Sequence, residues 1–206
     1  MKRTFVILAI LLSITAEAQF DTLAVHQQIR GSVDSMITAF RNGNWHTMAS
    51  YTNEKLVGFM GGTEAYARLV DSTLGRIMKD GSLDEYQAGK ILQVVKTPGG
   101  YQCIVESFLQ MTMNGTTVTG CSYNLGTSPN GTDWRFLRLE EDSPYDIKDF
   151  VPDLSPQLKL PSDQMALGVT LEEFKKTYKV QYRATKKPVK KTAPVKKKPK
   201  PKPKKQ

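Results

Sequence analysis

The chain has 206 residues, with 29 Lys and Arg against 20 Asp and Glu, which gives a formal net charge of +9 and a pI near 9.5. Such a balance suggests a polyanion-binding domain, but the excess charge sits at one end. Residues 186–206 hold eleven Lys and no acid, whereas residues 19–185 hold 16 basic and 19 acidic side chains. These counts exclude a globular domain that is itself basic.

The N-terminus has the pattern of an export signal. Lys2-Arg3 precede the apolar run FVILAILLSI, and Ala16-Glu17-Ala18 has the small-x-small form that signal peptidase accepts. We predict that residues 1–18 are a signal peptide cleaved after Ala18, which places the mature protein in the periplasm or the medium. The apolar run is too short for a membrane span, and no later segment reaches about eighteen apolar residues. No transmembrane span is therefore expected in the mature form.

Helical patterns dominate the first third of the domain. Apolar residues spaced by three and four form one stripe over 21–42, and a second helix over 44–51 begins at an Asn that can cap it. The short apolar run over 55–60 is interpreted as a strand. A Gly-Gly pair then opens a third predicted helix over 63–79, which ends before an Asp-Gly pair.

After residue 85 the apolar residues no longer recur at helical spacing but at every second position. Turn residues rich in Gly, Pro and Asn separate four alternating segments, at 86–96, 101–113, 116–125 and 134–139. Short turns between alternating segments are typical of an antiparallel meander.

Asn114-Gly115 fixes the register of the central hairpin, because this pair favours a two-residue turn. The resulting register places Cys121 five residues from the position opposite Cys103. That offset is roughly 17 Å along a strand, whereas a disulfide needs Cα atoms within about 7 Å. Export would permit a disulfide, but the geometry predicts two separate, mostly buried thiols.

The predicted hairpin over 101–125 is apolar on both faces. Helices can cover one face, and the opposite face needs a loop or a second subunit. We therefore predict a homodimer through the sheet. Residues 141–165 are rich in Asp, Pro and Ser. We expect residues 143–182 to wrap the domain and to include a short helix that starts at a Thr170–Glu173 capping box.

Three segments carry a family resemblance. The stretch AFRNGNWHTMASYTNEKLVGFMGG (39–62), with GYQCIVESF and DWRFLRLEED further on, resembles the helical start and the central and final strands of the nuclear transport factor 2-like superfamily. This superfamily includes polyketide-cyclase-like and ketosteroid-isomerase-like proteins. The resemblance covers residues 25–142 or so. It implies an α+β, cone-shaped domain over 19–142, with three N-terminal helices packed on a curved antiparallel sheet.

The superfamily holds enzymes, small-molecule binders and interaction domains, so its fold does not decide function. Isomerase-like members carry a carboxylate base near the first strand, and residues 55–60 contain no Asp or Glu. The candidate catalytic residues are Glu106, Tyr51, Tyr123 and His46.

Two of these candidates have open roles. Glu106, opposite Tyr123 in the predicted register, is either a pocket acid or, the favoured interpretation, an interface residue bonded to Tyr123 or a partner subunit. His46 is either a general base or a surface residue. Neither His26 nor His46 has a carboxylate or Cys at ligand spacing, so no metal or other cofactor is expected.

Two binding regions are predicted. An apolar ligand pocket is expected to be lined by Trp45, Tyr51, Tyr66, Tyr101, Val105 and Leu109. A disordered Lys/Pro-rich tail over 183–206 is expected to bind anionic envelope polymers through Lys190, Lys191, Lys196, Lys197, Lys198, Lys200, Lys202, Lys204 and Lys205. No aromatic residue interleaves these lysines, which argues against specific nucleic-acid recognition.

The sequence thus leaves two functions open. The favoured one is a secreted or periplasmic non-catalytic binding module with an apolar pocket, held at the envelope by its tail. The alternative is a small-molecule isomerase, dehydratase or cyclase-like enzyme that uses pocket acids.

Overall fold

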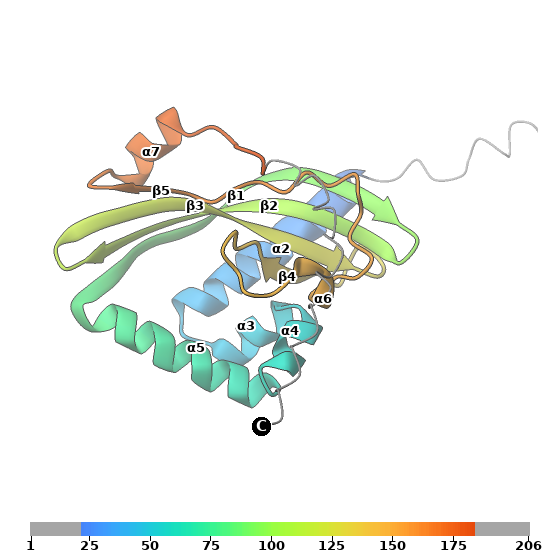
Figure 1. Ribbon diagram of the computed structural model, residues 1–206, viewed down its shortest axis with the longest axis horizontal. Coiled ribbons are helices and arrows are strands. Elements are labelled where there is room, and N and C mark those ends of the chain that lie inside the picture. The colour runs from blue at the N-terminus through green and yellow to red at the C-terminus, as the bar shows by residue number, and fades with distance from the viewer. Residues whose placement is uncertain (1–21, 184–206) are drawn as a thin grey trace, which may run out of the picture.

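An open antiparallel sheet with helices on both faces forms the centre of the protein, in a computed structural model that describes residues 22–183 (Figure 1). The α+β class predicted from the sequence is confirmed. In these residues the strands are β1 (Gly81–Thr97), β2 (Gly100–Met113), β3 (Thr116–Ser128), β4 (Arg135–Arg138) and β5 (Gln164–Leu167). The sheet order is β1-β2-β3-β4, and β5 also pairs with β3. The helices are α2 (Thr22–Arg41), α3 (Trp45–Tyr51), α4 (Glu54–Phe59), α5 (Thr63–Ile77), α6 (Ile147–Phe150) and α7 (Leu171–Thr177), with a 3-10 turn η1 (Met78–Asp80).

Helices α2, α3 and α5 form where the apolar stripes predict them. The stripe of α2 is buried at Ile29, Val33 and Met36. Asn44 caps α3, because its side-chain oxygen accepts a hydrogen bond from the Thr47 amide at 3.1 Å.

Residues 54–59 form helix α4, so the prediction of a strand over 55–60 is wrong. A short apolar run has no periodicity that separates a strand from a buried helical turn. The helix start decides the matter: Asn53 caps it by accepting the Leu56 amide at 3.1 Å. Glu54 in the first turn adds a favourable interaction with the helix dipole.

The hairpin between β2 and β3 has the predicted register. Asn114 and Gly115 take positive φ values of 49° and 73°, as a two-residue hairpin turn requires. Cys121 lies opposite Phe108, and Cys103 lies opposite Gly126. Both cysteines are free and buried, as predicted.

Two apolar clusters cover the two faces of the sheet. The inner face, with Cys103 and Val105, packs against α2 together with Trp134 and Phe136. The outer face, with Ile104 and Leu125, packs against the C-terminal extension, residues 141–183, through Phe150, Leu171 and Phe174 among others. Figure 1 shows α7 above the sheet, and α2, α3 and α5 below it; β5 lies at the edge of β3 within the sheet.

The outer face is therefore covered by the same chain. Ile104 and Leu125 have no exposed surface, and Phe108 is 6% exposed. The homodimer was expected because a second apolar face would need cover, and this reason does not hold for the outer face.

Within residues 22–183, no helix is both long and apolar enough to cross a membrane. The predicted signal peptide, with its cleavage site after Ala18, lies outside the described residues. So do the nine lysines of the predicted polyanion-binding tail.

Candidate functional site

The predicted catalytic residues do not come together. Glu106 and Tyr123 belong to the outer-face side of the sheet, whereas Tyr51 packs with the inner cluster. His46 lies at the surface, where its Nε2 is 3.0 Å from Glu64 Oε1. Glu106 and Tyr51 are thus separated by the sheet, and no constellation of these four residues can act on one substrate.

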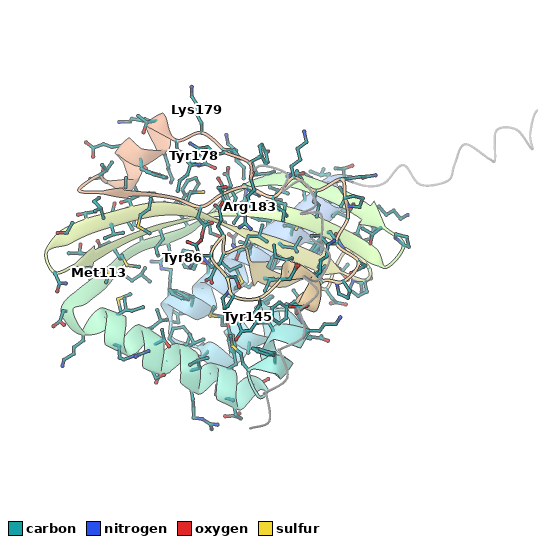
Figure 2. The ribbon with its side chains drawn as sticks, viewed as in Figure 1. Tyr86, Met113, Tyr145, Tyr178, Lys179 and Arg183 are labelled. Atoms are coloured by element: carbon teal, nitrogen blue, oxygen red, sulfur yellow. The ribbon has the colours of Figure 1, made fainter. Side chains whose placement is uncertain are left out.

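Glu106 is held by its own chain on the outer side. Its Oε1 accepts the hydroxyl proton of Tyr178 at 2.6 Å, and its Oε2 accepts the Lys90 amide at 2.9 Å. The Tyr178 and Tyr123 hydroxyl oxygens are 2.8 Å apart. Tyr178 follows α7 and lies above the sheet in Figure 2. The contact that the sequence analysis assigned to a partner subunit is thus made to Glu106 by the C-terminal extension of the same chain.

This polar cluster is closed. Glu106 is 1% exposed, and neither it nor Tyr178 lines any of four surface hollows in residues 22–183, whose volumes run from about 290 to about 540 Å³. An added Cβ at Gly89 would lie 2.5 Å from the Cβ of Glu106, so β1 also packs directly on the carboxylate. With Glu106 buried and both of its carboxylate oxygens bonded, the cluster attaches α7 to the sheet.

Burial keeps the neighbouring groups protonated. It raises the pKa of both Tyr123 and Tyr178, and for Tyr178 the hydrogen bond to Glu106 raises it further. Burial also raises the pKa of the Cys121 thiol to about 11. A protonated thiol is a poor nucleophile, so Cys121 is a structural residue at neutral pH.

The residues predicted to line one pocket lie in several places. Tyr66 is buried, and its hydroxyl group is hydrogen-bonded to the hydroxyl group of Thr52, with the two oxygens 3.1 Å apart. Val105 is core. Trp45 donates to Asp71 at 2.9 Å beside a small surface hollow, and Tyr51 lines another. Tyr101 and Leu109 line two larger hollows near opposite ends of β2.

The hollow at Leu109, here called the apolar hollow, has a volume of about 540 Å³. Its apolar lining consists of Leu109, Met111, Met113, Val118, Met165 and Leu167. The pairing of β5 with β3 sets Leu167 opposite Val118 and Met165 opposite Gly120, so all six side chains share the inner side. Figure 2 shows Met113 below the sheet, on the side of α5.

Gly120 allows the two strands to approach at this hollow. A Cβ at this position would lie 2.9 Å from the Gln164 carbonyl oxygen of β5. The three methionines are flexible and polarizable, which suits a surface that adapts to apolar shapes.

One end of the apolar hollow is polar. Arg138 Nη2 lies 3.6 Å from Asp163 Oδ2, and both residues line the hollow. The other oxygen of Asp163, Oδ1, is buried and has no hydrogen-bond partner in the described residues. Burial raises the pKa of Asp163, and Arg138 opposes this shift. This end can therefore orient a ligand that has one polar group.

Sequence reasoning placed Leu109 in a pocket but missed Met165, Leu167, Arg138 and Asp163. The alternation in QMAL (164–167) was the available signal for an edge strand. Nothing local indicates that this strand joins β3.

In residues 22–183, no three His, Cys, Asp or Glu side chains gather in a way that could hold a metal ion. Comparison of the chain with family models, curated proteins and solved structures gives no match.

Proposed function

We propose that this protein is an exported, non-catalytic binding module of the nuclear transport factor 2-like type, with a cone-shaped domain that holds a small apolar ligand. The apolar hollow carries the proposal: a cavity of about 540 Å³ with six apolar side chains and one charged pair is typical of small-molecule sites. The ligand has an apolar body over the methionines and one polar group near Arg138 and Asp163.

The enzyme alternative has no support in the described residues. Glu106 is closed off, and Tyr51 lies on the other side of the sheet. Export rests on the N-terminal pattern of residues 1–18.

Charges placed in the apolar hollow are expected to weaken ligand binding. Met165 and Leu167 are 73% and 67% exposed, so replacing both by Glu changes stability little but adds two charges to the lining. Titration with the neutral fluorescent probe N-phenyl-1-naphthylamine, followed by displacement with decanoic acid, should show binding at least about tenfold weaker in the double variant, because a buried charge opposes apolar contact.

Leu69→Glu is the matched control, since Leu69 is 48% exposed on α5 and outside the hollow. It should bind the probe as the unchanged protein does. Equal binding by the double variant, or no binding by the unchanged protein, would refute a ligand site in the apolar hollow.

The tail has a separate test. Mature protein should bind anionic vesicles at low salt and lose this binding as salt rises, because the attraction of eleven lysines depends on counterion release. A version that ends at Thr185 lacks all eleven and should not bind. If the two versions bind alike in co-sedimentation, the tail does not hold the protein at an anionic surface.

A further inference from the structure

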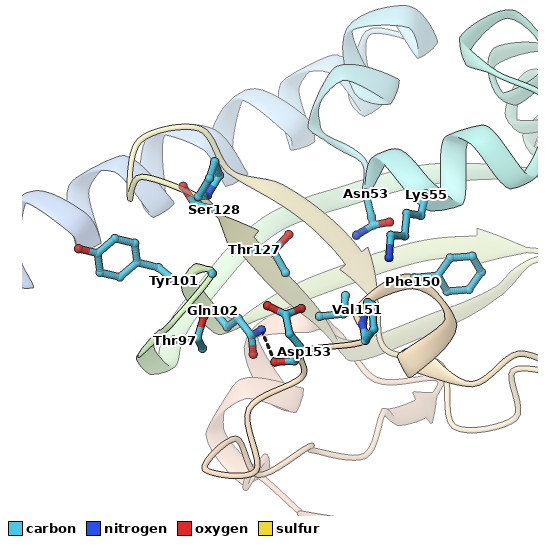
Figure 3. Close-up of a pocket in the computed structure, with 13 residues that line it drawn as sticks. Asn53, Lys55, Thr97, Tyr101, Gln102, Thr127, Ser128, Phe150, Val151 and Asp153 are labelled. Atoms are coloured by element: carbon cyan, nitrogen blue, oxygen red, sulfur yellow. Dashed lines mark hydrogen bonds between the residues drawn. The ribbon is translucent and has the colours of Figure 1, made fainter.

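A second hollow, here called the polar hollow, lies at the other end of β2. Its volume is about 510 Å³ (Figure 3). Its walls come from the start of α4, the β1–β2 turn, the end of β3 and the segment after α6. It shares no lining residue with the apolar hollow.

Asn53 supplies an unused donor to the polar hollow. The residue is 7% exposed, and its Oδ1 is occupied by the Leu56 amide as the cap of α4. This bond identifies the other amide atom as Nδ2, a donor. Nδ2 has no hydrogen-bond partner in residues 22–183, and Figure 3 shows it pointing into the hollow. Because the rest of the side chain is buried, this donor is available only from the hollow, where a ligand or water can accept its hydrogen bond.

A positive charge lies beside this donor. Figure 3 shows the Lys55 ammonium extending into the same hollow, next to the Asn53 amide. Within the described part of the chain, Lys55 has no carboxylate in ion-pair range. The two side chains thus form a donor pair, one neutral and one charged, that suits a carboxylate.

A negative charge faces this donor pair across the hollow. The Asp153 side chain points into the hollow in Figure 3, and no ion pair joins it to another side chain of residues 22–183. A Cβ at Gly99 would lie 3.0 Å from Asp153 Oδ2, so the glycine leaves room for the carboxylate.

The segment that carries Asp153 is fixed. Gln102 is 2% exposed; its Nε2 donates to the Asp153 carbonyl at 3.0 Å, and its Oε1 accepts the Ser155 amide at 2.9 Å. Buried amide side chains therefore hold the backbone of both walls in place. A backbone that is already ordered loses little entropy when a ligand binds.

We propose that the polar hollow binds a zwitterion of the amino-acid or short-peptide type. Asn53 and Lys55 bind its carboxylate, Asp153 binds its ammonium group, and its side chain packs on Phe150 and Val151, which also line the hollow. Opposite charges on facing walls distinguish this ligand from a simple anion, which would use only the Lys55 side.

Isothermal titration calorimetry of the mature chain tests the proposal with four probes: phenylalanine, phenylalanine amide, N-acetylphenylalanine and the dipeptide Ala-Phe. The amide lacks the carboxylate, and the N-acetyl form lacks the ammonium group. We expect the better of phenylalanine and Ala-Phe to bind at least about tenfold more tightly than either blocked form, because each loses one charge-assisted contact. The distance between carboxylate and ammonium group in the tighter of these two ligands indicates the distance between the Lys55 wall and the Asp153 wall.

Three variants assign the two walls. Asn53→Asp keeps an oxygen that can cap α4 but replaces the donor by a negative charge, so it should lose the preference for a free carboxylate while melting at a similar temperature. Lys55→Gln should do the same. Asp153→Asn keeps the main-chain bond to Gln102 and should lose only the preference for a free ammonium group.

Lys79→Gln, in η1 and outside the hollow, is the charge-matched control and should bind all four probes as the unchanged protein does. Equal binding of free and blocked probes, or no binding at all, would overturn the proposal. Tight binding of N-acetylphenylalanine would also overturn it, since this identifies a simple anion site. The Met165 and Leu167 double variant should bind zwitterions as the unchanged protein does. The proposal for the polar hollow can therefore fail while the proposal for the apolar hollow holds, and the reverse.

Discussion

Replacing Phe174 by Ala is expected to lower the free energy of unfolding by about 3–5 kcal/mol, the usual loss when a buried aromatic side chain is removed. Phe174 is 7% exposed in the outer cluster, and its ring stacks on that of Tyr178, with centroids 5.7 Å apart. The cavity lies between α7 and the sheet, where little can collapse to fill it. Urea unfolding followed by circular dichroism measures the change.

Leu167→Ala is the control for this prediction, because Leu167 belongs to the same extension but is 67% exposed. Its effect should stay within about 0.5 kcal/mol. If Phe174→Ala unfolds at the same urea concentration as the unchanged protein, the C-terminal extension does not stabilise the outer face.

Replacing Tyr178 by Phe is expected to cost about 1.5–3 kcal/mol, the range for a hydrogen bond to a charged group. The hydroxyl donates to Glu106 at 2.6 Å, and its removal leaves Oε1 of this buried side chain without a donor. The ring itself stays, so its edge contact with Phe108 is preserved. The same unfolding experiment reports the loss.

Tyr182→Phe controls for the loss of a tyrosine hydroxyl near the same end of the chain, since Tyr182 is 48% exposed. A double-mutant cycle with Tyr123→Phe then measures coupling, because the Tyr123 hydroxyl contacts Tyr178 at 2.8 Å. Additive losses, or no loss from Tyr178→Phe, would contradict a connected network around Glu106.

The polar hollow depends on a helix that the sequence pattern did not predict. Residues 54–59 form α4 in place of the predicted strand, and the start of this helix gives Asn53 its role as the cap. As the cap of α4, Asn53 has one amide atom bound inside the helix and the other directed outward. Asn followed by Glu was a helix-start signal in the sequence, but a six-residue apolar run gives too little periodicity to favour it.

The sequence by itself determined the features that depend on neighbours along the chain. Asn114-Gly115 set the hairpin register, and with it the pairing of Glu106 with Tyr123 and the separation of the two thiols. Thr170 and Glu173 made the expected capping box at the start of α7. Turns and caps are decided within a few residues, so their signals are readable without the fold.

Only the tertiary structure decided what lies across the sheet from each residue. Tyr178 reaches Glu106 from 72 positions away, and Met165 and Leu167 complete the apolar hollow because β5 joins the edge of β3. Such contacts depend on where the C-terminal extension packs. Its apolar residues are spaced irregularly, so the pattern along the chain indicates that they are buried but not against which face. The outer face of the sheet provides the apolar surface that they cover, and this decides the partner of Glu106.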